Sequence, residues 1–188
     1  MCIRDRRYAA VNALLGLSPD DLGLYFGPLE QAIDAWEQDL KGQPESADNQ
    51  YQLARLHLHN AELKEAQQAL QNTLRLAPGN LPALVMQIDV LDRLGQNDAA
   101  RQLLAKQLKA QPDSAYLQHA LGLWLLHHGQ SEFALLGLSK AVELEPDNKD
   151  YRYDLATTLH DEQELEAAQK QLQEIVQRHP ADRRARYC

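Results

Sequence analysis

Apolar residues recur along this chain at helical spacing, in pairs of stripes separated by short polar breaks. The clearest pair lies in residues 115–148, where a stripe containing Leu121 ends before Gly129 and a second stripe containing Leu138 follows. The prolines that close such pairs stand 34 residues apart, at Pro44, Pro78, Pro112, Pro146 and Pro180. This is the period of a helix-turn-helix solenoid, so the pattern predicts an all-α fold.

The period divides residues 47–182 into four units, 47–80, 81–114, 115–148 and 149–182. Each unit is expected to form a helical hairpin, with first helices near residues 48–60, 81–94, 114–128 and 148–160. Leu121 is predicted to fill a core position between two helices. A small residue recurs where the second helix crosses the first, because bulk there would push the helices apart: Ala66, Ala100, Ala134 and Ala168.

The residues outside the four units are interpreted separately. Residues 1–6 read MCIRDR, which matches a translated sequencing adaptor and is expected to be an artefact rather than native protein. Residues 7–46 predict packing helices over 8–17 and 28–40, the first of them interpreted as the end of a preceding helical-repeat unit. Residues 183–188 are interpreted as the truncated start of a further helix, so the chain is interpreted as a fragment of a larger protein.

An array that stops in this way is expected to leave apolar surface uncovered on its last helix. The apolar residues of this helix are Leu165, Leu172 and Ile175, and some of their surface is expected to be uncovered. This surface predicts fraying or self-association through the C-terminal end.

Charge and hydropathy limit the kinds of partner. The chain carries a net charge of −8, and the units 115–148 and 149–182 contribute −3 and −4. A negative surface argues against nucleic-acid binding. The longest uncharged apolar run, residues 120–126, is far shorter than a membrane span. We therefore expect neither a nucleic-acid partner nor membrane insertion.

No residue pattern indicates an enzyme, a metal or a cofactor. Cys2 and Cys188 stand at opposite ends of the chain, and there is no zinc spacing and no C-x-x-C-H haem site. The histidine pairs 57/59 and 127/128 lack the spacing of four that places two ligands on one helical face. No glycine-rich phosphate loop and no Ser-His-Asp set is present. We expect a chain that is not an enzyme, with no catalytic, metal-binding or cofactor-binding residue.

The recurring residues resemble those of the tetratricopeptide repeat, or TPR. A Leu followed by Gly or Ala, the small residue of the second helix, the Leu after it and the terminal Pro recur in phase over about three quarters of the chain. The unit 81–114 departs from the pattern with Gln87-Ile88. The resemblance implies a right-handed superhelical solenoid whose concave groove binds a protein or peptide, so that the chain acts as an interaction scaffold.

The resemblance also implies which residues line this groove, namely the exposed positions of each first helix. These groove residues are Tyr51, Arg55, His59, Val85, Asp89, Arg93, Tyr116, His119, Leu123, His127, Tyr153, Thr157 and His160. Tyrosine among histidine suits an extended peptide or a protein ridge. The alternative is a face that is only solvated. The Lys/Asn set by which some family members clamp a peptide's carboxylate is not matched, which disfavours a chaperone-tail receptor.

A second resemblance concerns the layout of residues 8–182. The order of helices such as LEQAIDAWEQDL and YLQHALGLWLLHHGQ is similar to C-terminal repeat regions of bacterial multihaem cytochrome-like proteins. It implies an alternative function, that of a non-haem docking arm of a periplasmic electron-transfer protein. If this second resemblance holds, the chain is expected to be periplasmic. Without it, the expected location is the cytoplasm.

Overall fold

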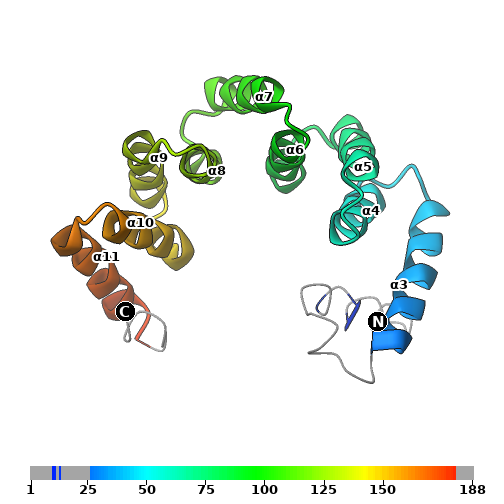
Figure 1. Cartoon of the computed structure of the whole chain (residues 1–188), viewed down its shortest axis with the longest axis horizontal. Helices are drawn as coiled ribbons and strands as arrows, with labels where there is room; N and C mark the ends of the chain where they lie inside the picture. Colours follow the sequence, from blue (N-terminus) through cyan, green and yellow to red (C-terminus); the bar gives the residue numbers. More distant parts are fainter. Residues whose placement is uncertain (1–9, 12, 14–25, 181–188) are drawn as a thin grey trace. The chain divides into compact units, whose positions relative to one another are not determined.

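The fold consists of helical hairpins, and a computed structural model describes residues 10, 11, 13 and 26–180 of the chain. In these residues every regular element is a helix (Figure 1). The helices are α3 (Phe26–Lys41), α4 (Ala47–His59), α5 (Leu63–Leu76), α6 (Leu81–Arg93), α7 (Asn97–Ala110), α8 (Ala115–His127), α9 (Ser131–Leu144), α10 (Lys149–Asp161) and α11 (Leu165–Arg178). The prediction of an all-α helical-repeat solenoid is confirmed, and each first helix lies within one residue of its predicted range.

The chain divides into two compact units, residues 1–97 and residues 98–188. In the first unit α3 packs on α4, α4 on α5 and α5 on α6. Leu56, Leu70 and Val90 are fully buried there, and Trp36 of α3 joins the same cluster. Of the helix predicted over residues 8–17, only Ala10, Val11 and Ala13 are described, and all three are helical. The remainder of that helix and residues 183–188 lie outside the described residues.

In the second unit α8 packs on α9, α10 packs on α11, and α9 contacts α10. Leu104, Leu117, Leu138 and Ile175 are fully buried. Tyr151 and Leu155 of α10 join Leu138 and Val142 of α9 in one cluster. The first helix of the fourth repeat therefore covers apolar residues of the second helix of the third.

Each first helix begins at a side-chain cap that recurs with the repeat. The capping oxygens belong to Ser46, Asn80, Ser114 and Asn148, and each accepts a hydrogen bond from the backbone N–H three residues later. The first N–H groups of a helix have no partner within it, so such caps stabilise the helix start. The polar residue after each proline thus sets where a repeat begins.

Each first helix also ends in the same way. The residue two places after the helix has a positive φ angle, at Ala61, Gly95, Gly129 and Gln163. The next backbone N–H donates to the carbonyl five residues earlier, as from Glu62 to His57 at 2.7 Å. This is the Schellman arrangement, which satisfies carbonyls left free at a helix end. It turns the chain sharply into the second helix.

A third recurring contact ties three of the four hairpins to the proline before them. Gln50 donates to the carbonyl of Pro44 at 3.3 Å, and Gln118 donates to that of Pro112 at 2.8 Å. Arg152 makes the same bond to Pro146 at 3.0 Å. The equivalent residue of the second repeat is Leu84, whose side chain has no donor.

The core of the hairpins confirms one prediction and corrects another. Ala66, Ala100, Ala134 and Ala168 are all buried, as predicted for helix crossings. Leu121 is only partly buried, so its predicted core position is wrong.

The physical reason is the close approach of α8 and α9. A Cβ atom on Gly137 would lie 3.1 Å from the backbone nitrogen of Gly122. Because α8 and α9 approach so closely at Gly122 and Gly137, little room remains for side chains between them. Leu121 lies at the flank of the crossing, where it lines a hollow with Phe133.

Candidate functional site

The first-helix face of the first unit is polar. On α4, Tyr51 and Arg55 are partly buried and His59 is exposed. The spacing of four places these residues along one side of the helix. Arg55 donates to Gln52 at 3.2 Å, so part of its guanidinium is bonded within α4.

On α6 the corresponding residues are Val85, Asp89 and Arg93. Val85 is partly buried, whereas Asp89 and Arg93 are exposed and form an ion pair at 3.6 Å. An exposed pair of this kind contributes little to stability and leaves both groups accessible to water. The first unit therefore presents a mixed polar surface with little apolar area.

The second unit presents a different face. On α8, Leu123 and His127 are exposed, while Tyr116 and His119 are partly buried. On α10, Thr157 and His160 are exposed and Tyr153 is partly buried. Leu123 is 42% exposed although it is a large apolar side chain. The residues at the same position of the other three repeats are Arg55, Asp89 and Thr157, so Leu123 is the apolar exception.

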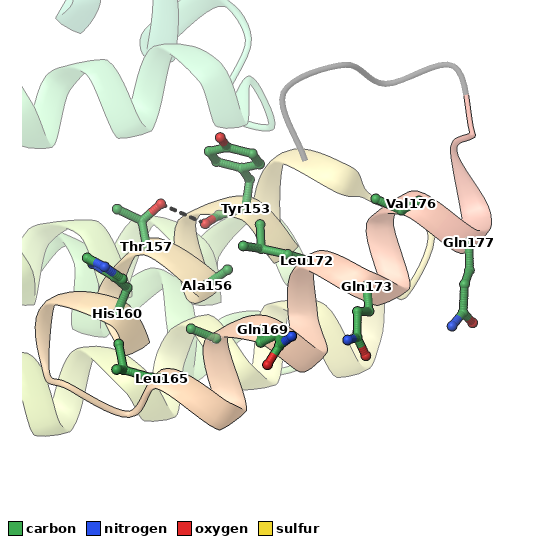
Figure 2. A pocket seen from close by; sticks show the side chains of 11 residues that line it. Tyr153, Ala156, Thr157, His160, Leu165, Gln169, Leu172, Gln173, Val176 and Gln177 are labelled. Carbon is green, nitrogen blue, oxygen red and sulfur yellow. Dashed lines mark hydrogen bonds between the residues drawn. The ribbon is translucent and has the colours of Figure 1, made fainter. Parts of the chain in front are cut away.

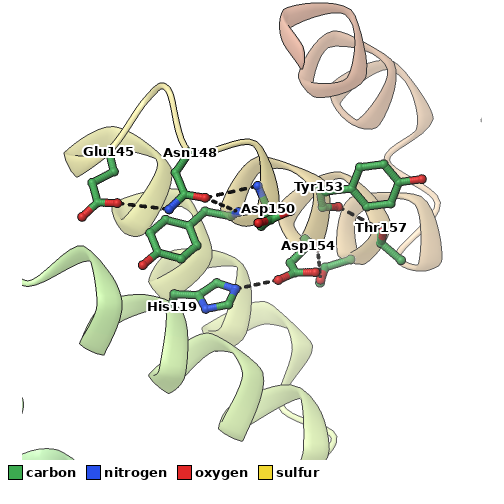
Figure 3. Close-up of polar contacts among 9 residues, drawn as sticks. His119, Glu145, Asn148, Asp150, Tyr153, Asp154 and Thr157 are labelled. Carbon is green, nitrogen blue, oxygen red and sulfur yellow. Dashed lines mark hydrogen bonds and ion pairs between the residues drawn. The ribbon is translucent and has the colours of Figure 1, made fainter. Parts of the chain in front are cut away.

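His119 lies between two repeats rather than projecting free from its helix. Its Nε2 donates to the Oδ2 of Asp154, on α10, at 2.6 Å (Figure 3). Its ring stacks on Tyr151 with centroids 4.4 Å apart. Burial raises the pKa of the Tyr151 phenol, and the nearby Glu145 carboxylate raises it further. His119 thus joins α8 to α10.

A hollow of about 330 Å³ lies beside this contact, between α8 and α10. Leu123, Leu126 and Thr157 contribute its apolar and hydroxyl surface. Its acidic lining consists of Asp154, Asp161 and Glu162. An apolar wall next to carboxylates suits a side chain with an apolar stem and a cationic end.

The family pattern does not include these three acidic residues among the groove residues, and in the sequence Asp161 and Glu162 are typical of a solvated helix face. Asp154 stands 35 residues after His119, one repeat plus one position. Residues at that separation lie on neighbouring first helices, so the repeat period contains a signal for this pair. Asp161 occupies the place in the fourth repeat that His127 occupies in the third.

A larger hollow, of about 780 Å³, runs between α10 and α11 (Figure 2). Three groove residues, Tyr153, Thr157 and His160, line one side of it. Thr157 donates its hydroxyl to the carbonyl of Tyr153 at 3.0 Å, which fixes its side chain on the helix. The opposite side is formed by α11, mainly by Leu165, Leu172, Val176 and three glutamines.

This hollow bears on the apolar surface predicted for the last helix. Leu165 is exposed and Leu172 is partly buried, so both reach the surface. Ile175 is fully buried, because it lies on the side of α11 that faces the hairpin core, so only part of this apolar surface is uncovered. Self-association through this end stays a prediction.

Within the described part of the chain, no three His, Cys, Asp or Glu side chains are grouped as metal ligands. In the same residues no helix combines the length and apolar character of a membrane span.

Comparison with known proteins places this architecture. A model of the tetratricopeptide repeat matches residues 62–123 and again residues 125–187. A curated relative, the uncharacterized protein y4yS of Sinorhizobium fredii (strain NBRC 101917 / NGR234), is 36% identical over 98 residues, which are 52% of this chain and 54% of that protein. The match therefore spans about half of the length of this relative.

Solved structures agree on the fold. TTC0263, a thermophilic TPR protein of Thermus thermophilus, is similar with a TM-score of 0.70 and 21% identity, over 97% of this chain and 95% of that one. Pseudomonas aeruginosa pilF has a TM-score of 0.60 and 23% identity, over 97% and 81%. YrrB, a TPR protein with an unusual peptide-binding site, has a TM-score of 0.55 and 20% identity, over 96% and 89%.

These relatives give no support to the resemblance to multihaem cytochrome-like proteins, and the docking-arm alternative stays a prediction. The two matches of the repeat model together cover more than half of the chain, so this chain belongs to the tetratricopeptide repeat family.

Proposed function

We propose that this chain is a scaffold that binds an extended segment of a partner protein along the first helices α8 and α10. TPR proteins are in general scaffolds for protein–protein interaction rather than enzymes. The finer assignment, to particular helices and residues and to a chain without catalysis of its own, is part of the proposal.

The observation that carries the proposal is the exposure of Leu123. An apolar side chain at the edge of a hollow loses contact with water when a partner covers it, which favours binding. Folding of the hairpin does not require Leu at this place, since the other repeats have Arg55, Asp89 and Thr157 there. Leu123 is therefore the proposed anchor, and Tyr116, His127, Tyr153, Thr157 and His160 are the proposed surrounding contacts.

The charge of this unit favours a basic partner. The third and fourth repeats carry net charges of −3 and −4. Asp154, Asp161 and Glu162 line the hollow beside Leu123. Complementary charge raises association rates and excludes acidic competitors. The proposed ligand is a segment with an apolar side chain next to Lys or Arg.

His119 has a different proposed role. Because its ring is held by Asp154 and Tyr151, it supports the positions of α8 and α10 rather than contacting the partner. In the first unit, the groove residues of α4 and α6 form a first-helix face of their own, and they are proposed as further contacts for the partner.

The test uses peptides selected from a random display library on the intact chain. Calorimetric titration then compares the wild type with Leu123→Gln, which removes the apolar anchor without adding charge. The matched control is Leu136→Gln, an exposed leucine on α9 that lies outside the proposed binding face. We expect binding to weaken at least about tenfold for Leu123→Gln only, since one buried leucine is worth about 1.5–3 kcal/mol. Equal affinity of both variants and the wild type would overturn the proposal.

A further inference from the structure

The outer side of the third repeat carries a second surface, and we propose that it pairs with the same surface of a second copy of this chain. This α9 patch consists of Leu121 and Leu125 of α8 with Phe133, Leu136 and Gly137 of α9. These residues line a hollow of about 440 Å³. Phe133 is 61% exposed and Leu136 is 69% exposed, more than any other large apolar side chain among the described residues.

The other repeats show that the hairpin does not need these apolar residues. In place of Phe133 they have Glu65, Ala99 and Ala167. In place of Leu136 they have Gln68, Gln102 and Lys170. Large apolar side chains that are exposed to water, at positions where the other repeats have small or polar residues, indicate an interaction surface.

The hollow itself results from a local change in the hairpin. In the fourth repeat Arg152 of the first helix donates to Gln171 of the second at 2.7 Å, and Leu155 is buried there. The residue that replaces Gln171 in the third repeat is Gly137. With no side chain at Gly137, nothing closes that side of the hairpin, and Leu121 remains partly uncovered.

The charges beside Leu136 identify a second copy as the occupant. Glu132 lies four residues before Leu136 and Lys140 four residues after it, so all three share one side of α9. Two antiparallel α9 helices related by a twofold axis at Leu136 place each Glu132 opposite the Lys140 of the other copy. Such an interface is self-complementary, as a twofold dimer requires.

The apolar residues fit the same arrangement. With Leu136 against Leu136 at the axis, the two exposed leucines cover each other, and Phe133 of each copy comes opposite Ser139 of the other. Lys140 forms an ion pair with Glu143 of its own helix, at 3.1 Å on the surface. A surface pair of this kind is weak, so the ammonium group remains available to Glu132 of the second copy.

This dimer does not depend on the proposed partner binding. The α9 patch shares no residue with the face around Leu123, and its occupant is the chain itself. It also differs from the predicted self-association through α11, which would require Leu165 and Leu172 instead. Variants on α9 and on α11 therefore separate the two modes.

The experiment is sedimentation equilibrium of the full chain, from about 5 to about 500 µM, a range that detects the micromolar affinity of small interfaces. We expect a monomer–dimer equilibrium for the wild type and at least tenfold weaker dimerisation for Leu136→Glu. Far-UV circular dichroism serves as the control for folding, because substitution of an exposed residue should leave the helix content unchanged. The matched control Leu165→Glu should dimerise like the wild type.

Charge exchange tests the antiparallel register. Glu132→Lys and Lys140→Glu should each weaken the dimer, because each creates two like-charge contacts across the axis. The double variant Glu132→Lys/Lys140→Glu should restore it, because opposite charges face each other again. A wild type that is monomeric at every concentration would overturn the proposal. So would a dimer lost in Leu165→Glu but kept in Leu136→Glu, or a double variant no better than its single parents.

Discussion

The imidazole Nε2 of His119 lies 2.6 Å from the Oδ2 of Asp154, and this contact links the first helices of the third and fourth repeats. The two residues are 35 positions apart. The ring is held from its face by Tyr151 as well. A histidine that the family pattern assigns to binding therefore contributes to the packing of neighbouring repeats.

We expect His119→Ala to lower the free energy of unfolding by about 1–2 kcal/mol, because the hydrogen bond and the ring contact are both lost. Urea denaturation measures this change. In a double-mutant cycle with Asp154→Ala the coupling should be only about 0.5–1 kcal/mol. The reason for this low value is that the Asp154 side chain is 41% exposed and water screens its charge. A coupling energy of zero would contradict a direct link between the two side chains.

The positive φ angles at the ends of the first helices give a second prediction. Ala61 and Gln163 adopt φ angles of 59° and 64°, where the other two repeats have glycine. A left-handed conformation costs a non-glycine residue about 1–2 kcal/mol, and substitution by glycine removes this cost. Glycine also has a larger conformational entropy in the unfolded state, which offsets part of the stabilisation. We expect Ala61→Gly and Gln163→Gly each to raise stability by about 0.5–1 kcal/mol.

The matched control for these variants is Ala99→Gly, in the exposed part of α7. Glycine inside a helix should lower stability by about 0.5–1 kcal/mol. Thermal melting that gives the same sign for Ala61→Gly and Ala99→Gly would refute the assignment of strain to Ala61.

The crossing of α8 and α9 predicts the effect of a single methyl group. A Cβ atom on Gly137 would lie 3.0 Å from the carbonyl oxygen of Gln118, which is backbone and cannot turn aside. We expect Gly137→Ala to lower the free energy of unfolding by about 1–3 kcal/mol, because α8 and α9 must move apart. The control Gly79→Ala has no atom within 4 Å of the new Cβ and should change stability much less. Equal effects of the two substitutions would be incompatible with a close helix crossing.

Leu121 and Leu155 occupy the same place in successive repeats but differ in burial. Leu155 is 3% exposed, whereas Leu121 is partly exposed at the hollow next to Phe133. We expect Leu155→Ala to cost about 2–5 kcal/mol, as for a buried leucine, and Leu121→Ala to cost clearly less. Chemical denaturation of both variants compares them directly. A larger loss for Leu121→Ala would mean that the hollow is closed in solution.

The fold was predictable because it depends on spacing. The prolines, the small residues and the apolar stripes recur every 34 residues, and helices built on this period begin within one residue of their predicted starts. The burial of individual side chains was less predictable. Whether Leu121 is covered depends on Gly137, a residue of another helix, and a pattern along one helix contains no information about its neighbour.

The candidate site was also predictable only in part. The family pattern assigns binding to particular residues of each first helix, but it cannot show that His119 is hydrogen-bonded to Asp154. It also passes over Phe133 and Leu136, because both belong to a second helix. Comparison of each position with its equivalents 34 residues away would have found them, since the other repeats have small or polar residues there.

The contacts at the start of the hairpins have a consequence for how the number of repeats changes in evolution. The capping side chain follows the proline by two residues, and the side chain that donates to its carbonyl follows by six. Excision of residues 81–114 would leave Asn80 as the cap of α8 and bring Gln118 to the sixth place after Pro78. Both junction contacts would re-form with residues already present. Unequal recombination can therefore shorten or lengthen such a gene by whole repeats without any new turn having to evolve.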